Sequence, residues 1–291
     1  MGNVRLFAKA KINLALDVVE KLDNGYHNLE MIMQSIDLSD TIEIKKTFTN
    51  DIKLRTNVYW IPTDNRNLVY KVAEYLKNEY NIKYGIHINL NKKIPSCAGL
   101  GGGSADCAAA LIGIRKLFGL DIPNSILLEV AKEFGADVPF CVKRGTYLAE
   151  GIGEKLTPLK KMPDCYILVV KPHVSISTAT IFQNLDLANI KERPDIEKII
   201  YYIEKDDIEG VSKNLCNVLE SVSIERYPII KDIKDAMLKN GALGSLMSGS
   251  GSAVFGIFKN KKQMAIAKNY IAKNLKVKDI FATRPFNMYK N

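Results

Sequence analysis

Apolar and polar residues along the first third of the chain follow mainly the spacing of β-strands. An apolar, β-branched run covers residues 12–22, and a second run over 26–46 resumes with alternating apolar and polar positions. Asn24-Gly25 lies between the runs, and this dipeptide favours a tight hairpin because both turn positions tolerate positive φ. The pattern therefore predicts a long β-hairpin at the start of the chain.

Helical and strand-like patterns are mixed through the rest of the chain. Spacing of three and four predicts a helix over 66–80, and alternation over 85–95 predicts a strand that leads into a glycine-rich loop. Further helices are expected over 105–118, 125–135, 179–187, 195–205, 207–219 and 226–239. A mixture of turn and strand is expected over 136–156, and a strand over 165–172. Without a regular βαβ rhythm, this mixture predicts an α+β fold.

The chain is long enough for two domains. A polar stretch with two prolines, residues 157–164, interrupts the patterned segments, and an apolar strand follows it. We therefore expect a border near residue 160, with domains over 1–160 and 161–291. The N-terminal residues have no apolar signal core and no run approaches the ~20 apolar residues of a membrane span, which predicts a cytoplasmic protein.

Composition narrows the classes of site. Five cysteines without C-x-x-C spacing and three scattered histidines fit neither a zinc site nor a disulfide framework, so we expect reduced thiols and no dedicated metal site. The net charge of +9 is compatible with nucleic acid, a polyanionic small ligand or a solvated surface. Because the lysines of 259–279 leave one apolar helical face free, a solvated helix face is favoured and no nucleic-acid partner is expected. The apolar face is predicted to consist of Met264, Ile266, Ala267, Tyr270, Ile271 and Leu275.

A glycine-rich loop is the strongest chemical signal. Four of the five positions from Gly99 to Gly103 are glycine, and Ser104 opens an alanine-rich helix. A strand that enters such a turn before a helix presents backbone N–H groups to an anion. No lysine precedes Ser104, which excludes the P-loop, and the third glycine of the dinucleotide fingerprint is missing. A tight packing turn is the alternative, although it rarely needs four glycines.

The segment "PSCAGLGGGSADCAA" resembles the ATP-phosphate motif of the galactokinase–homoserine kinase–mevalonate kinase–phosphomevalonate kinase (GHMP kinase) superfamily. Three more segments agree with that superfamily in order: "AKINLAL", "GADVPF" and "SGSGSAVF". Between the first two stands "NGYHNLEMIMQSIDLSD", which is typical of the branch whose substrate carries a cytidine diphosphate. The resemblance implies a two-domain fold with a ribosomal-protein-like N-terminal domain and a C-terminal ferredoxin-like α/β sandwich.

The resemblance also implies an activity. It predicts ATP-dependent phosphorylation of the 2-hydroxyl of a cytidine-diphosphate-linked methylerythritol, within the non-mevalonate route to isoprenoid precursors. ATP is the expected cofactor, and Mg²⁺ is expected to arrive with it. Rival readings are a sister kinase that acts on a smaller alcohol, such as homoserine or mevalonate, and a basic RNA-binding module. Oligomeric state is left open.

Two residues are predicted to be catalytic. Asp137 in "GADVPF" is the candidate base, with a turn or N-cap aspartate as the alternative. Lys11 is its expected partner, because an ammonium beside Asp137 would hold that carboxylate ionised. The superfamily generally carries proline where this sequence has Lys9, so two lysines compete for the role, and the register A-K-I-N-L selects Lys11. Alternation places Lys9, Lys11 and Asn13 on one strand face, so Lys9 is expected to border the same site and Asn13 to orient the substrate.

The remaining site residues divide between nucleotide and substrate. By resemblance, the ATP phosphates contact the glycine-rich loop and Asn67 lies near the adenine, with Asn65 as a weaker candidate; the loop residues are Pro95, Ala98, Gly99, Leu100, Gly101, Gly102, Gly103 and Ser104. His27 is expected to bond the cytosine edge while Tyr26 and Phe182 cover its two faces. Thr178 adds a polar contact, and the late loop is expected to bind the diphosphate through Gly249, Ser250 and Gly251, although a plain glycine turn is an alternative there.

Overall fold

The computed structural model describes residues 2–23 and 25–287 of the 291-residue chain. Asn24, one of the two predicted turn residues, lies outside the described residues. The chain forms two compact units whose segments interleave. The first comprises the described residues up to Ala10 with Leu38–Ile94 and Gly101–Lys143; the second comprises those of Lys11–Asp37, Pro95–Leu100 and Arg144 onward.

Two long strands supply parts of both units. Strand β1 runs over Asn3–Lys21 and β2 over His27–Thr47, in agreement with the predicted hairpin. At its turn the N–H of Leu22 donates to the carbonyl of Tyr26 (2.8 Å), and Gly25 adopts φ +83°. The middle of β1 is almost wholly buried, which is why its sequence is a near-continuous apolar run.

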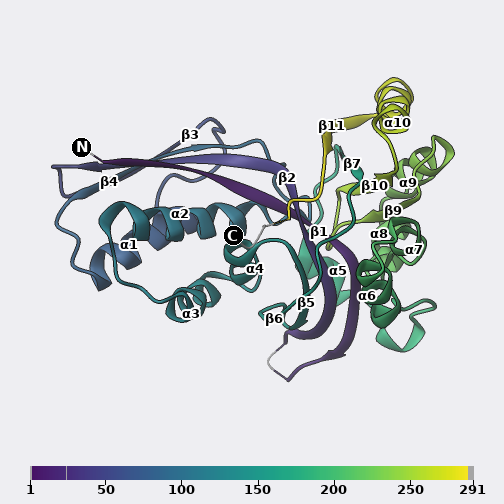
Figure 1. The fold of residues 1–291 in the computed structure, drawn as a ribbon, viewed down its shortest axis with the longest axis horizontal. Helices are drawn as coiled ribbons and strands as arrows, with labels where there is room; N and C mark the ends of the chain where they lie inside the picture. The colour runs from purple at the N-terminus through teal and green to yellow at the C-terminus, as the bar shows by residue number, and fades with distance from the viewer. Residues whose placement is uncertain (1, 24, 288–291) are drawn as a thin grey trace. The chain divides into compact units, whose positions relative to one another are not determined.

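The first unit is a sheet covered by helices. Its strand β4 (Gly85–Asn91) pairs antiparallel with the second half of β2 and parallel with β3 (Ile52–Thr56). Figure 1 shows the helices of this unit on one side of the sheet; they are α1 (Leu68–Glu79), α2 (Gly102–Phe118), α3 (Asn124–Phe134) and α4 (Val138–Lys143). A Cβ at Gly113 of α2 would lie 2.7 Å from side-chain atoms of Leu6 and Ile44, so glycine permits this close approach of helix and sheet.

The second unit contains a separate antiparallel sheet. Its order is β11 (Val277–Thr283), β7 (Tyr166–Pro172), β10 (Val254–Phe258) and β9 (Gly244–Met247). Helices α9 (Ile229–Lys239) and α10 (Lys261–Asn274) contact this sheet. The expected α/β sandwich of the C-terminal half agrees with this arrangement (Figure 1).

Shorter elements complete the second unit. Strand β5 (Thr146–Gly151) pairs with the first half of β2 and with β6 (Lys155–Pro158). The two-residue strand β8 (Cys216–Asn217) runs parallel to β1 at Ala15 and Leu16. The remaining helices are α5 (Thr178–Gln183), the 3₁₀ turn η1 (Leu187–Asn189), α6 (Ile196–Glu204), α7 (Ile208–Lys213) and α8 (Glu220–Arg226).

Several sequence expectations about elements are wrong. The single helix expected over 207–219 ends at Lys213, because the chain then enters β8 beside β1. The helix expected over 226–239 begins only at Ile229, since Pro228 separates it from α8. Helix α4 falls in a segment expected as turn and strand. On α10, Ile266 and Tyr270 are exposed rather than on the buried face.

The α+β class is confirmed, whereas the border near residue 160 stays a prediction. Within the described residues, none of the helices combines the length and apolar character needed to cross a bilayer.

Candidate active site

Two glycine-rich segments meet within the second unit. The hydroxyl of Ser248 donates to the carbonyl of Gly99 (2.9 Å), and the N–H of Ala253 donates to the carbonyl of Ala98 (3.1 Å). Gly99 has φ +73°, and a Cβ there would lie 1.9 Å from the carbonyl oxygen of Ser248. Glycine is therefore required at position 99 by both backbone conformation and packing.

Lys11 lies beside both of these segments. Its backbone N–H donates to the carbonyl of Leu100 (3.0 Å), and its Nζ donates to Oδ1 of Asn13 (2.7 Å). A Cβ at Gly249 would lie 3.4 Å from Lys11 Nζ. Lys11 is only 5% exposed, so a buried ammonium stands where the two glycine-rich segments approach each other. The hydrogen bond to Asn13 also places both side chains on the strand face that alternation predicts.

The late loop, defined here as Ser248–Ser252, is a tight turn fixed by its own backbone. The N–H of Ser248 donates to the carbonyl of Ala253 (2.9 Å), and the N–H of Gly251 donates to the carbonyl of Ser248 (3.0 Å). The hydroxyls of Thr178 and Ser250 lie 2.8 Å apart, which brings Thr178 to the loop as expected from the sequence. Gly249 and Gly251 both have positive φ, at +56° and +88°.

The structure brings His27 and Phe182 together. Their ring centroids are 4.9 Å apart and the ring planes are tilted by 36°. Burial, followed by the charge of Lys21, lowers the pKa of His27, which favours the neutral imidazole with one donor and one acceptor. Tyr26 is 59% exposed. An aromatic pair beside an exposed tyrosine has the composition of a site for a flat heterocycle.

The first unit holds the rest of the glycine-rich segment that begins at Pro95. Gly101 has φ +66° and precedes α2, whose first internal hydrogen bond runs from the N–H of Ala105 to the carbonyl of Gly101 (2.8 Å). No side chain in the described part of the chain caps this helix. The N–H groups of the first turn, Gly102 to Ser104, have no partner inside the helix, as at anion-binding helix ends.

Gly103 differs from the other glycines of the motif. It is exposed and helical, and a Cβ built on it meets no atom within 4 Å. Glycine within a helix costs about 1 kcal/mol relative to alanine, and nothing in the packing of the described residues requires it here.

A buried charge cluster, which sequence reasoning missed, lies behind this motif. Lys92 Nζ contacts Oδ2 of Asp40 (2.5 Å) and Oδ2 of Asp106 (2.6 Å), while Oδ1 of Asp40 accepts the N–H groups of Lys93 and Ile94. A Cβ at Gly102 would lie 3.3 Å from Lys92 Nζ. The available signal was Asp106, a carboxylate inside an otherwise alanine-rich helix.

Asp137 and Asn67 occupy helix starts in the first unit. Asp137 is half-buried and directly precedes α4, and its carbonyl accepts the N–H of Cys141 (3.1 Å). Its place at a helix N-terminus leaves both the catalytic role and the capping alternative standing.

Asn67 caps α1: Oδ1 accepts the N–H of Val69 (2.9 Å) and Nδ2 donates to the carbonyl of Pro62 (2.8 Å). Lys9 Nζ lies 5.5 Å from the ring centroid of Phe7. The pairing of Lys11 with Asp137 and the adenine contact of Asn67 stay predictions.

Comparison with known proteins decides the family. Residues 67–145 match the sequence model for the GHMP kinases N terminal domain and residues 199–277 the one for GHMP kinases C terminal. The chain is 49% identical over 258 residues to a 4-diphosphocytidyl-2-C-methyl-D-erythritol kinase of Caldicellulosiruptor bescii, covering 89% of this chain and 90% of the relative. It is 44% identical to the kinase of that name from Lachnospira eligens, covering 98% and 99%. This chain belongs to the 4-diphosphocytidyl-2-C-methyl-D-erythritol kinase family. It is therefore a small-molecule kinase with a GHMP fold.

Solved structures agree with this family. A crystal structure of 4-(cytidine 5'-diphospho)-2C-methyl-D-erythritol kinase matches with a TM-score of 0.83 at 28% identity, covering 97% of this chain and 99% of that one. A homoserine kinase from Cytophaga hutchinsonii matches with a TM-score of 0.76 at 21% identity, covering 97% of this chain and 95% of that one, and shares the fold alone. The sequence similarity thus favours the cytidylate branch over the sister kinases.

Proposed function

We propose that this chain transfers the γ-phosphoryl group of ATP to the 2-hydroxyl of 4-diphosphocytidyl-2-C-methyl-D-erythritol, in the non-mevalonate route to isoprenoid precursors. Membership of the family supports the reaction. The observation that carries the assignment of the site is the meeting of Lys11 with both glycine-rich segments in one unit. A buried cation beside two loops rich in backbone N–H groups is suited to hold two phosphate-bearing molecules.

The loop from Pro95 to Ser104 is proposed to hold the ATP phosphates. The uncapped start of α2 supplies N–H groups and the positive end of the helix dipole. A phosphate oxygen is proposed to occupy the open space beside Gly103, which an alanine methyl group would partly fill. We propose that Asn67, whose side chain caps the start of α1, lies near the adenine.

Mg²⁺ is proposed to arrive with ATP. Among the described residues no group of three or more His, Cys, Asp or Glu side chains is arranged to hold a metal ion. The motif offers the hydroxyl of Ser104, a donor set that fits an ion held mainly by phosphates and water. When bound, Mg²⁺ would neutralise phosphate charge, and Ser104 is the residue proposed to contact it or the phosphates.

The substrate end is proposed to lie in the second unit. His27 would bond the edge of the cytosine while Phe182 and Tyr26 cover its faces, which the 4.9 Å pairing of His27 and Phe182 supports. The late loop would bind the diphosphate through N–H groups of Gly249, Ser250 and Gly251, with Thr178 beside Ser250. Hydrogen bonds to the cytosine edge would select the cytidylated substrate over smaller alcohols, which carry no base.

Lys11 and Asp137 are proposed to act on the reacting hydroxyl. Asn13 fixes Lys11 Nζ, so the ammonium is held in one place and can stabilise the developing alkoxide charge. Asp137 is proposed to accept the hydroxyl proton or to orient the hydroxyl. The proposed domains stay those expected from the sequence: 1–160 for ATP and catalysis and 161–291 for Thr178, Phe182 and the late loop, with Tyr26 and His27 contributed to the substrate end from the first of them. The cytoplasmic location expected from the sequence stays a prediction.

The test is a coupled ATP assay on a panel of the cytidylated substrate, homoserine and mevalonate. Turnover of homoserine or mevalonate alone would overturn the substrate assignment. We expect Lys11→Met and Asp137→Asn to lower kcat by about 10²–10⁴ with folding intact by circular dichroism. Lys9→Met, two residues earlier on the same strand face, is the matched control and should retain most of the activity. A loss in Lys9→Met without one in Lys11→Met would reverse the assignment of the two lysines.

A further inference from the structure

The late loop is held from behind by one buried side chain. Asn217, which is 4% exposed, donates through Nδ2 to the carbonyls of both Met247 (2.9 Å) and Gly249 (2.8 Å). Its Oδ1 accepts the N–H of Leu219 (3.0 Å). Both N–H bonds of the amide therefore reach the segment that contains the late loop, and its oxygen anchors the amide to the start of α8. The short strand β8 positions Asn217 through its pairing with β1.

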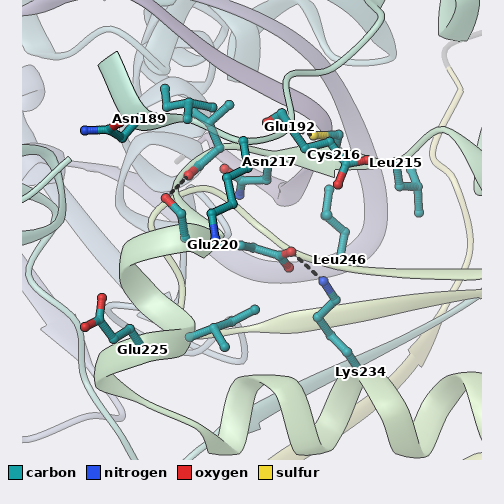
Figure 2. A pocket seen from close by; sticks show the side chains of 14 residues that line it. Asn189, Glu192, Leu215, Cys216, Asn217, Glu220, Glu225, Lys234 and Leu246 are labelled. Atoms are coloured by element: carbon teal, nitrogen blue, oxygen red, sulfur yellow. Dashed lines mark hydrogen bonds and ion pairs between the residues drawn. The ribbon is translucent and has the colours of Figure 1, made fainter. Parts of the chain in front are cut away.

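A second side chain fixes the strand that enters the loop. Oε1 of Glu220 accepts the N–H of Met247 (2.8 Å), while Oε2 is paired with Lys234 of α9. Met247 is thus held at both its N–H and its carbonyl. Figure 2 shows Asn217, Glu220 and Lys234 among the residues that line a pocket of about 630 Å³, with the Glu220–Lys234 pair marked by a dashed line.

The bond from Asn217 determines the direction of the Gly249–Ser250 peptide. In a trans peptide the carbonyl of one residue and the N–H of the next point to opposite sides. Because the carbonyl of Gly249 points to Asn217, the N–H of Ser250 points away from Asn217. Gly249 is the residue whose added Cβ would lie 3.4 Å from Lys11 Nζ, so this peptide stands beside the buried ammonium.

We propose that Asn217 and Glu220 are positioning residues for the substrate's diphosphate: they hold the late loop so that the N–H of Ser250 is presented to a phosphate oxygen. The inference deepens the proposed function and rests on it for the assignment of the diphosphate to the late loop. A preorganised N–H donor binds an oxyanion without paying for loop ordering at the moment of binding. Neither side chain touches the substrate in this arrangement.

Asn217→Asp is the variant that tests the proposal most directly. Aspartate keeps the size of the side chain and the acceptor for Leu219, but its carboxylate faces the carbonyl oxygens of Met247 and Gly249 where an amide donated. Glu220→Gln is the conservative substitution at the second positioning residue, because glutamine retains an acceptor for the N–H of Met247. Glu220→Ala removes that acceptor. Ser221→Ala and Glu225→Gln are matched controls, since both residues line the same pocket from α8 and are not partners of the late loop in the bonds described.

Two measurements test the proposal: steady-state kinetics with each substrate varied, and hydrogen exchange of amides 247–253 in the substrate-free protein. For Asn217→Asp we expect KM for the cytidylated substrate to rise about tenfold or more, KM for ATP to change less than about twofold, and exchange of the loop amides to accelerate. Glu220→Gln should recover most of the affinity that Glu220→Ala loses, and the two controls should match the wild type.

Equal increases of both KM values with a lowered melting temperature would show a merely structural role and overturn the inference, as would unchanged KM values. If Asn217→Asp does not fold, Glu220→Ala measured in the same way decides the question. Wild-type turnover of the cytidylated substrate tests the proposed function separately. The exchange comparison needs no substrate, so it reports whether Asn217 holds the loop even if that function is wrong.

Discussion

Each of the two glycine-rich loops is supported by a cluster of charged side chains with little exposure to solvent, and the two clusters differ in charge balance. Behind the start of α2, the ammonium of Lys92 forms ion pairs with two carboxylates, Asp40 and Asp106. Behind the late loop, one ammonium, Lys234, serves one carboxylate, Glu220. In both clusters a carboxylate also accepts backbone N–H groups at the entrance of the loop. The shared design fixes where the chain enters each loop.

The first cluster has one carboxylate more than it has ammonium groups. Burying it therefore costs more free energy than burying the pair of Glu220 and Lys234. Oδ1 of Asp106 is buried and has no hydrogen-bond partner among the described residues. Burial, followed by the charge of Asp40, raises the pKa of Asp106 well above its usual range despite the opposing effect of Lys92. The two aspartates outweigh burial at Lys92 and raise its pKa. Protonation of Asp106 would balance the charge of this cluster and remove a negative charge from the helix that is proposed to receive ATP.

Removing the shared ammonium should produce the largest effect. Lys92→Met removes the ammonium that contacts both Asp40 and Asp106, so at least one buried carboxylate loses its counter-charge and we expect the free energy of unfolding to fall by about 3–5 kcal/mol. Urea denaturation followed by circular dichroism at pH 7 measures this loss. Lys93→Met, on the exposed neighbour, is the control and should change little. A loss below about 1 kcal/mol in Lys92→Met would mean that the cluster is not held by charge.

The equivalent change behind the late loop should cost less. Lys234→Met leaves one carboxylate that still accepts the N–H of Met247, and the side chains of this pair are 19% and 13% exposed, so water can partly compensate. We expect a loss of about 1–3 kcal/mol in the same denaturation experiment. Lys231→Met on the same helix, which removes an exposed pair with Asp235, should have little effect. If Lys234→Met and Lys92→Met lower the free energy of unfolding by the same amount, the difference in charge balance does not determine how much each cluster contributes to stability.

The glycine-rich loops could be predicted from the sequence, whereas their supports could not. A loop such as 99–104 is recognisable because its glycines are adjacent and two of them, Gly99 and Gly101, need positive φ. Lys92 lies 52 positions from Asp40 and 14 from Asp106. Only the pairing of β2 with β4 and the packing of α2 bring these three side chains together, and no local pattern encodes that.

Asn217 was missed for a related reason. It lies in a run expected as one helix over 207–219, and its strand conformation depends on pairing with β1, far away in the sequence. Tertiary pairing overrides local propensity in so short an element. Helix α4 escaped prediction because its six residues include proline and are too few to show a period. Motifs for binding are local and visible, while the residues that position them are distant in the chain.

The smallest effect should be the one that depends on pH. For a carboxyl group whose pKa is raised by folding, the folded state binds more protons than the unfolded state between the two pKa values, so stability falls as pH rises through that window. Asp106 should therefore stabilise the protein below its unfolded pKa of about 3.9 and lose that contribution towards its raised folded pKa.

Asp106→Asn removes this titration while keeping an acceptor for Lys92. Its free energy of unfolding relative to wild type should increase with pH above about 4, by roughly 1 kcal/mol for each pH unit inside the window. Urea denaturation of both proteins at pH 5, 6, 7 and 8 gives the two curves. Glu220→Gln, in the balanced cluster, is the comparison: burial raises the pKa of Glu220 while Lys234 opposes the shift, so its curve should diverge from wild type less steeply. Parallel curves for Asp106→Asn and wild type would mean that Asp106 has the same charge in the folded and unfolded states, and the surplus carboxylate would then need a partner other than a proton.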